Sequence, residues 1–195
     1  MLKNGLPLEK FKFDKEKRIG LRKGFGVEKD FVIGHVGRFS KQKNHKFLID
    51  IFKAFKKKNK NSKLMLIGDG PLRKEIEEYA TSQGVREDIL FLGIRNDVSD
   101  IYNCMDCFVF PSLYEGMPNT VIEAQTSGLP CVISNTITTE VNLTEKIEFC
   151  SIKDAGLWIE KIKKTENREQ DYKILKEKGY DIEDIVNEFI KICYI

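Results

Sequence analysis

The chain has 195 residues, enough for one domain with a sizeable hydrophobic core. Its 33 lysines and arginines against 30 aspartates and glutamates give a formal charge of +3, which is too small an excess to indicate a nucleic-acid-binding protein. No apolar run approaches the ~20 residues that a membrane-spanning helix needs. The sequence begins with a polar segment and lacks the pattern of a signal peptide, so we expect a cytoplasmic protein.

The predicted elements begin with a charged, glycine-rich segment at 1–30 that contains a short helix at 15–23. After it, short apolar runs alternate with amphipathic helices, which is typical of βαβ units and a parallel sheet. Strands are expected at 31–37, 64–67, 89–93, 108–110, 130–133 and 148–150. Helices are expected at 45–60, 72–83 and 98–103. Another is expected to follow the loop at 112–118 and to end near Gly128, and three more are expected at 154–164, 168–178 and 182–192. We therefore predict an α/β domain with a Rossmann-like parallel sheet of about six strands and helices on both faces.

Polar residues follow several of the predicted strands. Arg38 comes after the first strand, Gly70 after the second, Arg95 after the third and Glu115 after the fourth. Parallel sheets bind ligands at the carboxyl ends of their strands. The order of elements therefore predicts one ligand-binding rim that carries all four residues.

The segment 112–124 joins the fourth strand to the next helix through a loop that contains glycine and proline. The N–H groups at a helix N-terminus are free, and that end carries a partial positive charge, so it suits a phosphate. Pro118 fits an early helical position, where its missing N–H costs nothing. Glu115 and Glu123 are eight residues apart, which is about two helical turns. One carboxylate can then face the reacting end of a ligand while the other lies farther along it.

Four segments resemble those of a known family or of one of its subgroups. The two glutamates eight residues apart, the first before glycine and the second before alanine, resemble the signature of retaining glycosyltransferases of the GT-B fold, in particular glycosyltransferase family 4. Gly-Arg-x-x-x-x-Lys at 37–43 resembles the donor-diphosphate motif of this family, and residues 4–11 resemble its interdomain crossover. The segment 135–140, where many members have Gly-Gly-x-x-Glu, resembles a subgroup that acts in bacterial capsule and exopolysaccharide synthesis.

The resemblance implies that the chain is the C-terminal half of a GT-B enzyme. Residues 1–30 would form the interdomain crossover, and residues 31–195 a nucleotide-sugar-binding domain with C-terminal helices. The acceptor would bind to an N-terminal domain outside this sequence, so the chain alone is expected to transfer sugar poorly or not at all. Peripheral contact of a full-length enzyme with the inner face of the membrane stays open.

The resemblance also implies roles for single residues. Arg38 and Lys43 would stabilise the donor diphosphate, and Glu115 would contact the donor sugar. The ribose would bind to Glu123, and the base near Arg95. The remaining residues expected to approach the donor are Gly70, Gly116, Met117, Pro118, Asn119 and Thr120. The donor would be a UDP- or GDP-linked sugar, and we expect no cofactor and no metal, because no Asp-x-Asp stands in a suitable loop.

Other interpretations of the same residues stay open. The glutamates and the two cations could be solvated side chains of an ordinary crossover, and Gly70 could be a turn glycine. The chain could also be a nucleotide-sugar 2-epimerase or a binding module without turnover. We expect His35 and the five cysteines to be core residues, with the thiols reduced.

Overall fold

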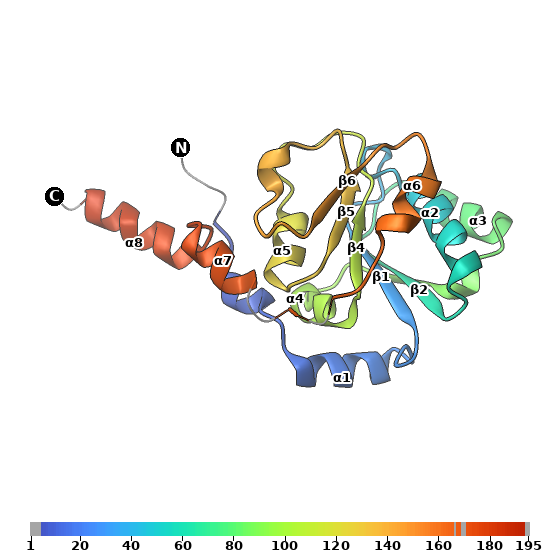
Figure 1. Cartoon of the computed structure of the whole chain (residues 1–195), viewed down its shortest axis with the longest axis horizontal. Coiled ribbons are helices and arrows are strands. Elements are labelled where there is room, and N and C mark those ends of the chain that lie inside the picture. Colours follow the sequence, from blue (N-terminus) through green and yellow to red (C-terminus); the bar gives the residue numbers. More distant parts are fainter. Residues whose placement is uncertain (1–4, 166, 169–170, 194–195) are drawn as a thin grey trace.

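The computed structural model describes residues 5–165, 167–168 and 171–193. Figure 1 shows a sheet with helices on both sides. The six strands follow the order β3-β2-β1-β4-β5-β6, and all neighbouring pairs are parallel. They are β1 (Phe31–Val36), β2 (Ser62–Ile67), β3 (Ile89–Gly93), β4 (Cys107–Phe110), β5 (Cys131–Ser134) and β6 (Ile147–Cys150). This confirms the predicted Rossmann-like sheet.

Eight α-helices occur in the described part of the chain. They are α1 (Lys15–Gly24), α2 (His45–Lys58), α3 (Arg73–Ser82), α4 (Val98–Ile101), α5 (Asn119–Thr126), α6 (Ala155–Lys161), α7 (Asp171–Glu177) and α8 (Ile182–Cys193). The short 3-10 helices are η1 (Leu8–Phe11), η2 (Lys41–Lys43), η3 (Arg86–Asp88), η4 (Tyr102–Cys104) and η5 (Thr139–Val141). The helix predicted at 154–164 is shorter than expected, because the backbone adopts an extended conformation at Ile162 and buries the Ile162 side chain.

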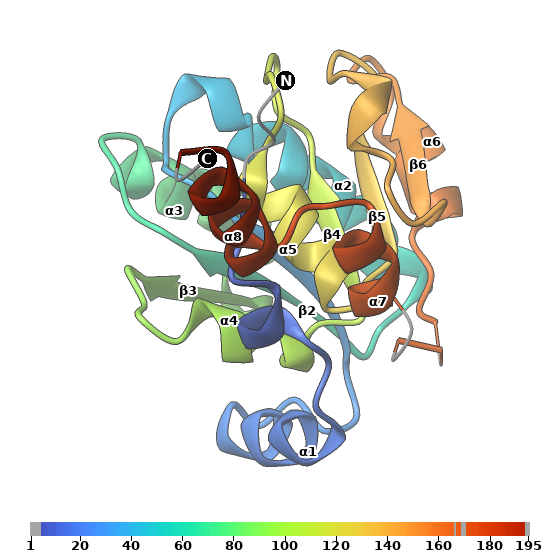
Figure 2. The ribbon, with the colours of Figure 1, turned by 90° about the vertical axis from the view of Figure 1, so that its left-hand side faces the viewer.

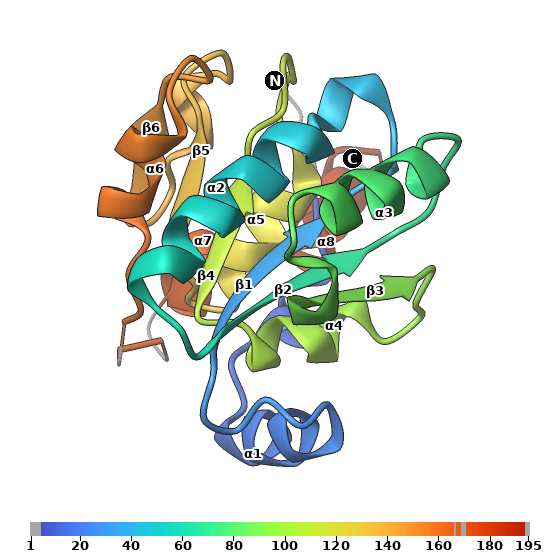
Figure 3. The same ribbon diagram turned by 90° about the vertical axis from the view of Figure 1, so that its right-hand side faces the viewer.

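The core is divided between the two faces of the sheet, because successive strand residues point to opposite sides. Phe108 and Phe110 of β4 belong to the cluster that includes residues of α5, while Val109 belongs to the cluster that includes residues of α2. Figure 3 shows α2 and α3 over one face, and Figure 2 shows α4 and α5 over the other. Burial on both faces explains why the strands are continuous apolar runs rather than alternating ones.

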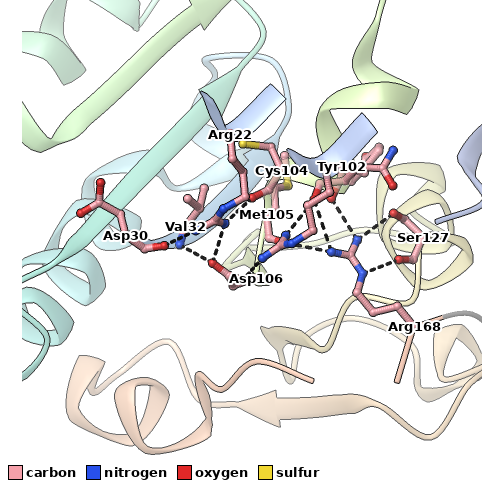
Figure 4. A network of polar contacts seen from close by, with 11 residues as sticks. Arg22, Asp30, Val32, Tyr102, Cys104, Met105, Asp106, Ser127 and Arg168 are labelled. Carbon is pink, nitrogen blue, oxygen red and sulfur yellow. Dashed lines mark hydrogen bonds and ion pairs between the residues drawn. The ribbon is translucent and has the colours of Figure 1, made fainter. Parts of the chain in front are cut away.

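Helix α1 lies beyond the N-terminal ends of the strands (Figure 1) and is fixed there by a network around Asp106. The carboxylate accepts hydrogen bonds from Arg18 at 2.5 Å, from Arg22 at 3.0 Å and from the N–H of Val32 at 2.8 Å (Figure 4). A cleft of about 860 Å³ opens beside α1, and these arginines and Arg168 line it. The network ties α1 to both β1 and β4. The domain boundary at residue 30 stays a prediction.

Helix α8 extends away from the sheet (Figure 1), and its base is held by Leu6. The Leu6 N–H donates to the carbonyl of Tyr180 at 2.9 Å, and the Ile182 N–H donates to the carbonyl of Leu6 at 3.0 Å. Farther along the helix, Phe189 is 52% exposed and Ile190 is 48% exposed. Within the described ranges, no helix is both long and apolar enough to pass through a bilayer.

Candidate functional site

The candidate site lies where β1 and β4 are neighbours, which is the point at which the strand order reverses. Open α/β sheets bind ligands at such a switch point, outside the carboxyl ends of the strands. The loops that follow the two strands are in contact. The Leu113 N–H donates to the carbonyl of Gln42 at 2.8 Å, and the Gln42 side chain donates to the carbonyl of Tyr114 at 2.9 Å. The structure therefore brings the loop with Arg38 and Lys43 against the loop with Glu115.

Lys43 and Glu115 form an ion pair at the centre of this contact. The Lys43 Nζ lies 2.6 Å from Glu115 Oε1, and the two side chains are only 16% and 12% exposed. The same Nζ lies 4.6 Å from the centroid of the Phe110 ring. Asn44 has a φ of 54°, a left-handed conformation that asparagine tolerates, and it connects η2 directly to α2. The ion pair of Lys43 and Glu115 places one positive and one negative charge side by side at the rim.

The loop before the N-terminus of α5 lies beside this ion pair. The backbone N–H groups of Gly116 and Met117 donate to no described residue, and Pro118 provides no side-chain cap. The structure corrects the prediction for Pro118, which is the N-cap with a ψ of 113° and not a helical residue. The extended conformation at Pro118 turns the loop so that the helix begins only at Asn119. Free donors and the positive helix end make this a suitable position for an anion.

Glu115 lies in the loop before α5, as expected, so the spacing of two helical turns does not describe its whole separation from Glu123. Glu123 lies inside α5, and its Oε2 accepts a hydrogen bond from the hydroxyl of Tyr102 at 2.9 Å. Burial raises the pKa of Glu123, and the hydrogen bond from Tyr102 opposes that shift. Tyr102 was not predicted from the sequence, because no local pattern marks it.

Arg38 lies at the rim with its side chain exposed, and its guanidinium forms no hydrogen bond or ion pair with a described residue. Gly70 packs against the loop of Arg38: a Cβ on Gly70 would lie 2.6 Å from the carbonyl oxygen of Phe39. The packing of the chain itself therefore requires a glycine at position 70, which favours the interpretation of Gly70 as a turn glycine.

Arg95 is exposed and forms a two-point ion pair with Asp97 at 2.6 and 2.8 Å.

The remaining predicted residues lie along the start of α5. Met117 packs against the core, and Asn119 is exposed. The Oγ1 of Thr120 and the Oγ of Ser112 are buried without a hydrogen-bond partner among the described residues. Thr136, in the loop after β5, donates to the carbonyl of Ser112 at 3.1 Å, so a third loop reaches the site.

The two histidines lie beneath the rim in the core. The Nδ1 of His35 is 2.9 Å from the carbonyl of Val109, while its Nε2 and both ring nitrogens of His45 have no partner in the described structure. Burial lowers the pKa of His35 to about 4 and that of His45 to about 2, so both rings are neutral. His35 is thus a core residue as predicted, although only one of its ring nitrogens has a partner.

Four of the five cysteines are buried free thiols: Cys104, Cys107, Cys131 and Cys150. Burial raises the pKa of Cys107 to about 12, so this thiol stays protonated. The prediction of core cysteines is confirmed for these four, and their reduced state stays a prediction. The side chain of Cys193 lies outside the described residues.

The fold and the rim define a Rossmann-like domain with a polar site at its switch point, and comparison with known proteins identifies its family. Residues 18–182 match the family model of the glycosyl transferases group 1. The chain belongs to this family. It is 36% identical over 205 residues to the glycosyltransferase EpsF of Bacillus subtilis (strain 168), covering 100% of this chain and 53% of that protein. It is also 36% identical over 191 residues to the capsular polysaccharide biosynthesis glycosyltransferase CapM of Staphylococcus aureus, covering 95% of this chain and 44% of CapM.

Solved structures support the same fold. The Anabaena protein Alr3699/HepE, crystallised with UDP and glucose, matches with a TM-score of 0.81 at 21% identity, covering 98% of this chain and 55% of that one. The C-terminal domain of the group 1 protein LpcC from Francisella tularensis matches with a TM-score of 0.72 at 19% identity, covering 91% of this chain and 100% of that domain. The chain spans about half the length of the full-length relatives EpsF and CapM.

Proposed function

We propose that this chain is the donor-binding unit of a retaining glycosyltransferase. The enzyme transfers a sugar from a nucleoside diphosphate sugar to a polysaccharide or lipid-linked acceptor. One observation carries the proposal: at the switch point of the sheet, the Lys43–Glu115 ion pair lies next to the backbone N–H groups of Gly116 and Met117, which donate to no described residue. Cationic, anionic and backbone N–H groups are thereby available for a diphosphate and the sugar attached to it.

The diphosphate binds between Lys43, Arg38 and the backbone N–H groups before α5. Cleavage of the sugar–phosphate bond places more negative charge on the leaving oxygen, and positive groups held in advance lower the free energy of that state. The planar guanidinium of Arg38 has no competing partner in the described structure, so it is available to two phosphate oxygens. These two cations take the place of a metal ion.

Glu115 faces the sugar side of the same site. Its carboxylate accepts hydrogen bonds from the sugar and orients the reacting centre. The same carboxylate also accepts a hydrogen bond from the ammonium of Lys43 and holds it in place. When the donor binds, a phosphate oxygen joins or replaces Glu115 as the partner of Lys43, because a diphosphate carries more negative charge than one carboxylate.

The relatives support the class of donor and acceptor. A relative in Escherichia coli, 39% identical over 144 residues, is a galactosyltransferase named for UDP-Gal and a diphosphoundecaprenol-linked acceptor, and the match covers 69% of this chain and 36% of that enzyme. CapM is named for capsular polysaccharide biosynthesis. We assign donor binding to the present chain and acceptor binding to residues outside it. Contact with the inner face of the membrane is part of this proposal for the full enzyme.

Calorimetric titration with UDP, GDP and ADP in a buffer with EDTA tests the proposal. We expect the folded chain to bind at least one of these nucleotides without a divalent metal. The nucleotide that binds most tightly is called the reference nucleotide below. The corresponding nucleoside, which lacks the diphosphate, should bind at least about tenfold more weakly because the charge-assisted contacts are lost. A folded chain that gives no heat with any of the three does not contain the donor site.

A further inference from the structure

Tyr102 connects η4 to the carboxylate assigned to the ribose. Its side chain is fully buried, and its hydroxyl donates to Glu123 Oε2 at 2.9 Å. The same hydroxyl lies 3.2 Å from the carbonyl oxygen of Thr120, one turn earlier on α5. A hydroxyl has one proton to donate, and the charged carboxylate is the closer and stronger acceptor.

The position of Tyr102 is itself fixed from several sides. Its ring packs edge-on against Phe11 at 5.9 Å and tilted against Phe108 at 5.8 Å between centroids. Its carbonyl accepts a hydrogen bond from Arg168 at 3.1 Å (Figure 4). Arg168 also donates to the carbonyl and the hydroxyl of Ser127, the C-cap of α5, at 2.8 and 2.9 Å. Tyr102, which holds Glu123, is therefore connected through Arg168 to the C-terminal end of α5, the helix that carries Glu123.

The second oxygen of Glu123 is left available. Its Oε1 accepts no hydrogen bond from any residue in the described ranges, and Glu123 is only partly buried. A carboxylate with one oxygen held by the protein keeps a fixed orientation. The other oxygen can then accept from a ligand hydroxyl without the entropy cost of fixing a free side chain.

We propose that Tyr102 is a positioning residue for ribose recognition: its hydroxyl holds Oε2 of Glu123 so that Oε1 accepts a hydrogen bond from a ribose hydroxyl of the donor. This inference rests on the proposed function, because it needs a nucleotide at the rim. Tyr102 acts through Glu123 and does not touch the donor. Its contribution is to the selection of a ribonucleotide over an analogue that lacks the hydroxyl.

The test is titration of the wild-type chain and of Tyr102→Phe with the reference nucleotide and with its 2′-deoxy and 3′-deoxy forms. The wild-type chain is expected to bind one of the deoxy forms at least about tenfold more weakly than the reference nucleotide. In Tyr102→Phe, affinity for the reference nucleotide should fall about tenfold, while affinity for that deoxy form changes less than about twofold. The preference for the ribose hydroxyl thereby nearly disappears.

Equal losses for the ribose and deoxy forms would show that Tyr102 acts only on the structure of the site, and this would overturn the inference. Unchanged affinities would overturn it as well. Tyr79→Phe is the matched control, because Tyr79 donates to the carboxylate of Asp50 at 2.7 Å on the opposite face of the sheet. It should leave all affinities unchanged. Failure of the wild-type chain to bind any nucleotide would overturn the proposed function together with this inference.

A second measurement needs no substitution, in case Tyr102→Phe does not fold. In wild-type protein labelled with ¹³C at tyrosine Cζ, the resonance of Tyr102 reports on its hydrogen bond to Glu123. We expect this resonance to shift on addition of the reference nucleotide and to shift less with the discriminated deoxy form. The same shift with both nucleotides, or none with either while calorimetry shows binding, would overturn the inference.

Discussion

Lys43→Ala is expected to weaken binding of the reference nucleotide by about 2–5 kcal/mol, a loss of at least about 30-fold. Two effects act together. The diphosphate loses its most shielded cation, and the carboxylate of Glu115 is left partly buried without the partner that now lies 2.6 Å away. The unpaired negative charge then repels the incoming diphosphate. Calorimetric titration of both proteins measures the change.

The control for this prediction is Lys41→Ala, two positions earlier in the same 3-10 helix. Lys41 is exposed and forms no side-chain ion pair within the described ranges, so its loss should change affinity by less than about threefold. The double variant Lys43→Ala/Glu115→Gln should bind the reference nucleotide more tightly than Lys43→Ala, because the repelling carboxylate is gone. If Lys43→Ala and wild type have equal affinities, the diphosphate does not contact this lysine.

Asp106→Asn is expected to lower the free energy of unfolding by about 3–5 kcal/mol, the usual cost of removing one partner from a buried ion pair. Asp106 is 7% exposed and is the carboxylate shared by Arg18 and Arg22 (Figure 4). The asparagine leaves two guanidinium groups without their counter-charge. It also weakens the contact that joins the N–H of Val32 at the start of β1 to the start of β4.

Urea denaturation of the wild-type chain and the variant, followed by circular dichroism, measures this loss. Asp100→Asn is the matched control, since Asp100 pairs with Lys17 of α1 at 2.6 Å but both side chains are at least 38% exposed. Exposed pairs contribute about 0–1 kcal/mol, so this variant should be nearly as stable as wild type. Similar losses for the two variants would contradict the view that the buried network anchors α1.

Local patterns predicted most of the fold. The apolar runs marked all six strands, and the three- and four-residue spacing of Phe47, Leu48, Ile51, Phe52 and Phe55 marked α2. Helix ends were harder to predict, because they depend on contacts with distant parts of the chain. A helix was expected at 168–178, but Arg168 is not helical and its side chain donates to the carbonyl of Ser127 at the C-terminus of α5, while α7 is described at Asp171–Glu177.

The contacts within the candidate site were less accessible to sequence analysis. Position after a strand was enough to place Arg38 and Glu115 on one rim, because parallel strands end at the same edge. The contact between Lys43 and Glu115 depends on β1 lying next to β4, which no local pattern reveals. Tyr102 is 21 residues from Glu123 and was part of an unremarkable short helix in the sequence. Its role depends on the packing of η4 against α5.

The position of the nucleotide on the protein is the most direct test of the account. Addition of the reference nucleotide to ¹⁵N-labelled protein should shift the backbone amide resonances of Lys43, Gly116, Met117 and Asn119, at the switch-point rim. Resonances around Arg22 and Asp106, in the large cleft at the other end of the strands, should stay in place. Shifts confined to that cleft, with an unchanged rim, would contradict the central claim that the diphosphate binds between Lys43 and the N-terminus of α5.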